Sequence, residues 1–130
     1  MPTELITVYG ETDNTNATGV FTLKGQLFTN SVNYIRLDKG LKAKIWAKRV
    51  AGAPLVLKVE VTDDVTVDNP SWRVIDAEFL TSPGNIDLEK RHPIIVEFKT
   101  GKEAFRFSWD QSATGVGKSY VSFDIEIEEV

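Results

Sequence analysis

The chain has 130 residues, of which 42% are hydrophobic and 26% are charged, and its formal net charge is −4. This balance is typical of a globular protein and excludes a chain that is disordered throughout. The absence of cysteine excludes disulfides, thiol nucleophiles and cysteine-bound metals, and the single histidine excludes sites that need several histidines.

Apolar and polar residues alternate along most of the chain, as they do in antiparallel sheets that are covered on one face. Strands are predicted near residues 4–9, 19–28, 31–37, 41–50, 55–62, 72–80, 93–99, 104–109 and 119–128. The alternation is clearest in 57–62, 94–99, 105–110 and 121–128. We expect one all-β domain over residues 1–130, a two-sheet antiparallel β-sandwich of eight or nine strands.

The connections between these strands are of two kinds. Asp38-Lys39-Gly40 and Lys99-Thr100-Gly101 are predicted to be three-residue hairpin loops, each with a glycine at positive φ. Longer polar connections are predicted over Gly10–Gly19, Asp63–Ser71, Thr81–His92 and Asp110–Lys118. This mixture of tight and long connections favours jelly-roll or Greek-key wiring over an up-and-down barrel.

The strand at 41–50 has a basic face that carries Lys42, Lys44, Trp46 and Lys48. Three interpretations stay open for this face. The lysines protect an edge strand from aggregation, the tryptophan anchors a contact with another subunit, or the face stacks single-stranded nucleic acid. The excess of acids over bases in the whole chain disfavours the nucleic-acid interpretation.

The last strand is acidic, with Asp124, Glu126 and Glu128 on one face. Like charges two residues apart on a strand repel, so this strand gains if basic groups lie opposite. The lysine face at 42–48 is the richest source of such groups. The two strands could pair within one chain, or between copies of the chain in a ring or shell.

Two further motifs are interpreted as structural. The segment Ser112–Ser119 ends in Gly-Lys-Ser, as a phosphate-binding loop does, but a strand rather than a helix follows it, so nucleotide binding is rejected. His92 precedes Pro93 at the start of a predicted strand, and no serine motif is present that could form a catalytic triad with it.

The remaining candidates are an acidic loop and two tryptophans. The loop Asp63–Asn69 carries oxygen ligands for calcium but lacks the EF-hand glycine and glutamate, so a solvated turn is favoured and no metal is assigned. Trp72 and Trp109 lie at strand ends, where a carbohydrate platform would use them, although packing in the core or at its rim is the commoner role.

The N-terminus has no basic run followed by an apolar stretch, and no segment has the roughly 18 apolar residues of a membrane helix. We therefore expect synthesis in the cytoplasm, no membrane partner and no cofactor.

The leading functional hypothesis is a non-enzymatic structural or assembly protein that works as a homo-oligomer or with other structural subunits. In size and strand pattern the chain resembles the small sandwich proteins that decorate virus or phage particles, which would place it in a virion as a capsid decoration protein. Its expected interface is Lys42, Lys44, Trp46, Lys48, Asp124, Glu126 and Glu128. The alternatives are a carbohydrate-binding β-sandwich module, with or without calcium, and then a single-stranded nucleic-acid binder.

Overall fold

The computed structural model describes residues 4–25, 33–80 and 94–130. In these ranges it contains nine strands and no helix. The strands are β1 (Glu4–Glu11), β2 (Thr18–Val20), β3 (Lys24–Gly25), β4 (Leu41–Gly52), β5 (Leu55–Thr62), β6 (Arg73–Leu80), β7 (Ile94–Glu97), β8 (Ala104–Asp110) and β9 (Ser119–Glu129).

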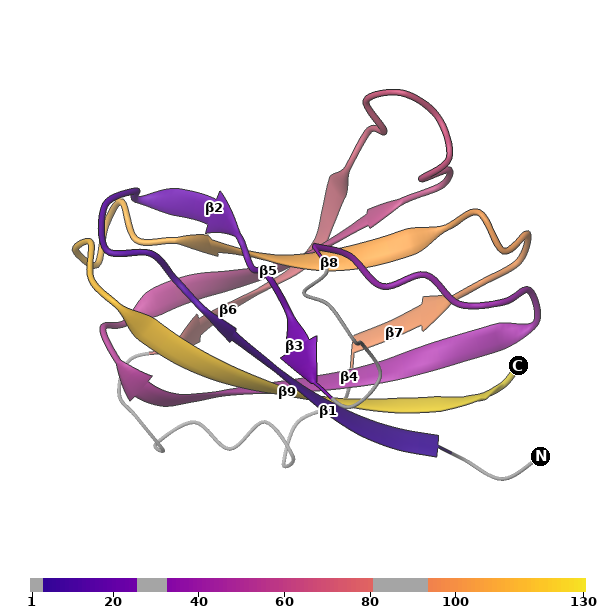
Figure 1. Cartoon of the computed structure of the whole chain (residues 1–130), viewed down its shortest axis with the longest axis horizontal. Coiled ribbons are helices and arrows are strands. Elements are labelled where there is room, and N and C mark those ends of the chain that lie inside the picture. Colours follow the sequence, from indigo (N-terminus) through magenta and orange to yellow (C-terminus); the bar gives the residue numbers. More distant parts are fainter. Residues whose placement is uncertain (1–3, 26–32, 81–93) are drawn as a thin grey trace.

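The strands form two antiparallel sheets that pack face to face as a β-sandwich (Figure 1). One sheet has five strands in the order β3-β1-β9-β4-β7, and the other has four in the order β2-β8-β5-β6. Strands far apart in the sequence are neighbours, as β1 and β9 are, which is the wiring expected of Greek-key sandwiches. The predicted fold class is therefore confirmed.

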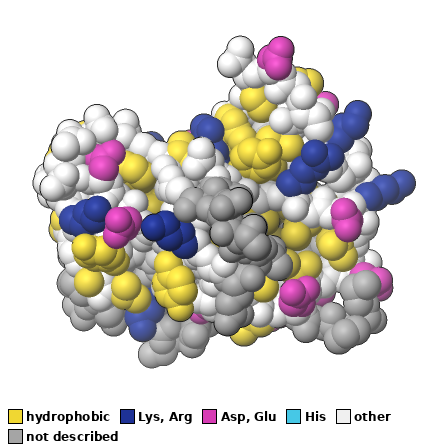
Figure 2. Space-filling model, in the orientation of Figure 1, with side chains coloured by type: hydrophobic (Ala, Val, Ile, Leu, Met, Phe, Trp, Pro, Cys, Tyr) yellow, Lys and Arg dark blue, Asp and Glu magenta, His cyan; other side chains and the backbone are white. Residues whose placement is uncertain are grey.

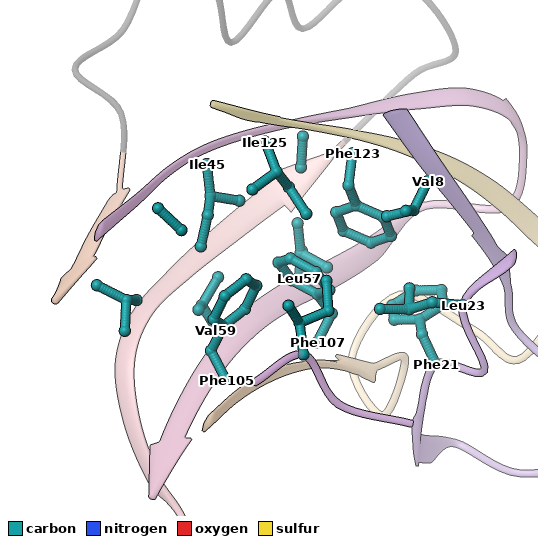
Figure 3. Close-up of a cluster of buried hydrophobic side chains, with 14 of the residues drawn as sticks. Val8, Phe21, Leu23, Ile45, Leu57, Val59, Phe105, Phe107, Phe123 and Ile125 are labelled. Atoms are coloured by element: carbon teal, nitrogen blue, oxygen red, sulfur yellow. The ribbon is translucent and has the colours of Figure 1, made fainter. Parts of the chain in front are cut away.

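Aromatic and branched side chains from both sheets fill the space between them (Figure 3). The rings of Phe107 on β8 and Phe123 on β9 stack with their centroids 3.9 Å apart, and thereby join the two sheets. Phe21 meets Phe123 and Trp109 edge to face. Each such ring contributes about 2–3 kcal/mol through the apolar surface that it buries.

The tight connections differ from the prediction. Gly40 and Gly101 do have positive φ, at 88° and 78°. Neither is in a hairpin, however, because 38–40 leads from a segment beside the four-stranded sheet into β4, and 99–101 leads from β7 to β8 in the other sheet. The glycines turn the chain across the edge of the sandwich.

Two predicted strands also differ. The one at 19–28 is divided into β2 and β3, which belong to different sheets, because Phe21 and Leu23 turn into the core at the corner between them. Of the one at 31–37, the described residues 33–37 make only an isolated bridge between Ile35 and Phe105. The predicted connection Thr81–His92, with His92 itself, lies outside the described residues.

The predicted long connections around 12–17, 63–72 and 111–118 are present. The first and last of them meet at one end of the molecule, opposite the end that carries the start of β1 and the end of β9 (Figure 1). No helix in the described ranges has the length and apolar character needed to cross a membrane.

Candidate functional site

The outer face of the five-stranded sheet carries all seven residues of the expected interface. Because β4 and β9 pair in antiparallel register, Lys42 faces Glu128, Lys44 faces Glu126 and Trp46 faces Asp124. The seven side chains therefore share one surface by pairing within one chain, which is one of the two arrangements that the sequence left open.

The charges on these two strands compensate one another within the chain. Lys44 and Lys42 lie 3.0 Å and 3.2 Å from the carboxylate of Glu128, and Lys44 lies 4.0 Å from that of Glu126. Hydrogen bonds from Lys44 and then Lys42 lower the pKa of the Glu128 carboxyl. The acidic strand thus has its basic partner in the same molecule. Compensation of its charge does not require a contact between copies, and such a contact stays a prediction.

The other half of the same face contains a groove of about 600 Å³, called here the tyrosine groove. It crosses the sheet at the end where β9 begins. It is lined by Tyr9, Gly10, Glu11, Thr12, Asp13, Thr22, Lys24, Val50, Lys118, Tyr120 and Val121. Figure 2 shows hydrophobic side chains beside basic and acidic ones at this end of the molecule, on the left of the view.

Strand alternation and a β-bulge build the groove floor. Tyr9 and Tyr120 occupy outward positions between buried neighbours, and they are 56% and 42% exposed. The register between β4 and β9 shifts between Arg49 and Ala51, so Val50 is an extra residue opposite Tyr120. Bulges bend a strand locally and are frequent beside binding sites. Two phenol rings and Val50 therefore offer an exposed apolar surface.

Polar groups surround this floor. The Lys118 ammonium lies 3.1 Å from the carboxylate of Glu11. Asp13 accepts hydrogen bonds from Asn16 and Thr15 in its own loop, and these lower its pKa to about 2. The loop that carries Asp13 is thus held by its own carboxylate and does not need a ligand to be ordered.

A buried hydrogen-bond network fixes the loops beneath the groove. The Thr12 hydroxyl donates to the carbonyl of Gly117 and accepts from the N–H of Ser119. The Gln111 amide donates to the carbonyls of Pro54 and Gly117 and accepts from the Gly117 N–H. Three separate connections are joined in this way, which makes the groove end rigid.

Arg49 is the largest charged side chain in the core. It is 1% exposed and donates to the Gly52 carbonyl, and burial lowers the pKa of its guanidinium. Among residues 4–25, 33–80 and 94–130, its Nε and second terminal nitrogen have no hydrogen-bond partner, nor does the Ser119 hydroxyl.

The two tryptophans proposed as a carbohydrate platform pack against neighbouring side chains. Trp109 is 6% exposed and packs against Phe21, so its ring cannot meet a ligand. Trp72 is half-buried, with the guanidinium of Arg106 4.2 Å from its ring centroid and Tyr34 on another side. Arg106 is in turn bound to Glu60 at 2.7 Å, so this cluster holds the 63–72 connection against the sheet.

The Asp63–Asn69 loop forms a self-contained turn. Asp64 accepts hydrogen bonds from the backbone and hydroxyl of Thr66, and Asp63 pairs with Arg73 at 3.0 Å. Asn69 takes a positive φ of 51°. Across residues 4–25, 33–80 and 94–130 no three potential ligands gather at a metal-binding distance. The carboxylates of Asp63 and Asp64 are already engaged by neighbours.

The segment with the phosphate-loop ending forms a turn that leads directly into β9. Its Lys118 points to Glu11, and no helix N-terminus follows it. The rejection of nucleotide binding is consistent with this geometry.

The sequence interpretation missed the two tyrosines of the groove. The available signal was an aromatic residue at a polar position of an alternating strand, as Tyr120 is in line with Ser122 and Asp124. That Tyr9 and Tyr120 lie on one surface depends on β1 pairing with β9, which no local pattern shows.

No protein-family model matches the sequence, and no curated protein is similar to it. The fold is similar to part of a solved structure from Clostridium thermocellum, the CBM22-1–GH10 modules of an N-terminal endo-1,4-β-D-xylanase 10B in complex with xylohexaose. The TM-score is 0.48 at 15% identity, and the match covers 95% of this chain and 25% of that one.

Proposed function

We propose that this chain is a non-catalytic carbohydrate-binding β-sandwich whose ligand lies across the tyrosine groove. The observation that carries the proposal is the pair of exposed phenol rings of Tyr9 and Tyr120, placed with Val50 on the floor of a polar-rimmed groove. The groove volume of about 600 Å³ is within the usual range for small-molecule sites.

The chemistry of a saccharide suits these groups. A sugar ring has an apolar C–H face, which packs on an aromatic ring whose face is electron-rich. It also has hydroxyl groups at its edges, which need hydrogen-bond partners. Thr22, Glu11 and Lys118 stand at the rim with donors and acceptors of both kinds. The groove therefore offers aromatic rings for stacking together with polar groups for hydrogen bonding.

The state of the groove carboxylates supports binding rather than hydrolysis. A glycosidase needs a carboxylic acid whose pKa is raised towards the working pH. The hydrogen bonds from Asn16 and Thr15 lower the pKa of Asp13 to about 2, so it is ionised at neutral pH. Glu11 is paired with Lys118. Neither carboxylate is arranged as a general acid.

The test is affinity electrophoresis through gels that contain soluble polysaccharides. We expect retardation of the wild type, and a loss of affinity of about tenfold for Tyr9→Ala and for Tyr120→Ala, because each loses a stacking ring. Tyr34→Ala is the matched control, since Tyr34 is also 42% exposed but lies by Trp72. Leu5→Ala controls for the same sheet face, where Leu5 is 62% exposed.

All variants should keep the wild-type circular dichroism spectrum, because the changed side chains are exposed. Retention of single-stranded DNA by the wild type, with no polysaccharide bound, would contradict the proposal. So would wild-type affinity in both tyrosine variants.

A further inference from the structure

We propose that the saccharide bound in the tyrosine groove is anionic, with its carboxylate or sulfate groups held by Lys24 and Lys48. This inference rests on the proposed function and names the class of its ligand. It follows from how the lysines on the outer face of the five-stranded sheet are paired.

Lys24 is part of the groove lining, and the strand register places Lys48 just beyond the lining, on the other side of Tyr9. Tyr9 on β1 pairs with Lys24 on β3 and with Ser122 on β9, and Ser122 pairs with Lys48 on β4. The four residues form one row across four strands. Since neighbouring strands are about 4.8 Å apart, the Cα atoms of the two lysines are separated by about 14 Å, with the tyrosine between them.

These two ammonium groups differ from those of Lys42 and Lys44 in their partners within the described residues. Lys42 and Lys44 are bound to Glu128 on β9. Lys24 and Lys48 are exposed, and neither makes an ion pair with any residue in the described ranges. Residues 26–32, which follow Lys24, contain no acid that could pair with it.

Among the described residues, the acids near this row are already engaged. Glu11 pairs with Lys118 at 3.1 Å, and Asp13 accepts hydrogen bonds from its own loop. Asp124, beside Trp46, accepts the Thr7 hydroxyl at 2.8 Å. The groups left to recognise a charged ligand are therefore cations, and charge-assisted hydrogen bonds from ammonium to carboxylate or sulfate are the strong ones.

The experiment compares neutral and anionic forms of the same polymer backbone, again by affinity electrophoresis. Hydroxyethyl cellulose and carboxymethyl cellulose form one pair, and dextran and dextran sulfate form the other. We expect the anionic member of at least one pair to bind about tenfold more tightly, and added salt to weaken that binding because the charges are exposed. The two pairs distinguish carboxylate from sulfate.

Variants then test whether the preference for the anionic polymer depends on Lys24 and Lys48. Lys24→Ala and Lys48→Ala should each lose about threefold or more in affinity for the anionic polymer, and Lys24→Arg and Lys48→Arg should retain it. Lys39→Ala removes the same charge from an exposed turn away from the groove and should bind as the wild type does.

The outcomes separate this inference from the proposed function. Equal binding of neutral and anionic polymers, with Lys24→Ala and Lys48→Ala unchanged but Tyr9→Ala impaired, overturns the anionic ligand and keeps the groove. Anionic binding that survives Tyr9→Ala overturns the inference, because the charge is then recognised elsewhere. If the wild type binds no polysaccharide at all, the proposed function fails and this inference with it.

Discussion

At the residue scale, Arg49 is the most costly side chain in the core. The guanidinium is 1% exposed, in a position that the alternation of β4 assigns to an apolar residue, and two of its nitrogens have no partner in the part of the chain that the structure describes. Burying a charge without a counter-charge costs several kcal/mol, which a single backbone acceptor offsets only in part.

Replacing this side chain should stabilise the fold. We predict that Arg49→Met raises the free energy of unfolding by about 1–3 kcal/mol, because the methionine fills similar space without a charge. Urea unfolding followed by tryptophan fluorescence measures this change. Lys48→Met at the adjacent exposed position is the control and should change stability by no more than about 0.5 kcal/mol. A destabilised Arg49→Met would show that the guanidinium is well satisfied.

Gly52 is constrained in two ways, by a positive φ and by the close approach of another backbone segment. It has φ 92°, and a Cβ there would collide with the Lys118 carbonyl oxygen. Gly40 has φ 88° but open space around the same position. A comparison of substitutions at Gly40 and Gly52 therefore distinguishes the cost of backbone strain from the cost of steric overlap.

We predict that Gly40→Ala costs about 1–2 kcal/mol, from the left-handed backbone alone. Gly52→Ala should cost more, by at least about 1 kcal/mol, since the 52–54 and 117–119 segments must also move apart. Urea unfolding of the two variants makes the comparison. Equal losses would mean that the contact at Gly52 relaxes freely.

At the element scale, the pairing of β4 with β9 links stability to pH. The pKa of Glu128 lies below its usual value in the folded chain because Lys44 and Lys42 hydrogen-bond to it. A carboxyl with a lowered folded pKa contributes stability above its unfolded pKa. That contribution is lost as the pH falls through the folded pKa.

We therefore predict that Glu128→Gln is less stable than the wild type at pH 7, and that the difference shrinks towards about pH 3. Urea midpoints at the two pH values measure it. Glu129→Gln is the control, because Glu129 lies at the strand end and makes no ion pair within the described ranges. A difference that persists unchanged at low pH would contradict this role of the lysines.

The individual strands show how far the sequence predicts the fold. The strong alternation at 57–62, 105–110 and 121–128 identifies strands because one face of each is buried. It cannot show which sheet a strand joins, and so Gly40 and Gly101 were predicted to close hairpins where the chain changes sheets. The division of 19–28 has the same cause, since apolar residues at a corner alternate as a strand does.

The candidate site was predicted only in part. The lysine and acidic faces were identified from their charge, and their compensation within the chain was one of two open alternatives. The groove depends on Tyr9, Tyr120 and Val50, which come from three strands distant in sequence, so no local pattern brings them together.

Assembly into a homo-oligomer stays a prediction of the sequence, with the surface at 42–48 and 124–128 as its interface. Light scattering at high protein concentration and low salt measures it. A salt-sensitive oligomer would support this surface, while a strictly monomeric protein would contradict it and leave the groove proposal untouched.

At the scale of the whole molecule, the two ends of the sandwich differ. One end carries the start of β1 and the end of β9, and the other carries the loops joined by Thr12 and Gln111 (Figure 1). The tyrosine groove is lined by residues of this second end, so it opens on a rigid end, away from the start of β1. A rigid site loses little conformational entropy on binding, which favours a preformed saccharide site.

The assignment of the groove as the binding site is tested most directly by the affinity of wild type, Tyr9→Ala and Tyr34→Ala for the soluble polysaccharide that retards the wild type most. We predict that Tyr9→Ala loses about tenfold or more, while Tyr34→Ala binds as the wild type does. Equal affinity in all three proteins, or a loss confined to Tyr34→Ala, would contradict the assignment of the groove as the binding site.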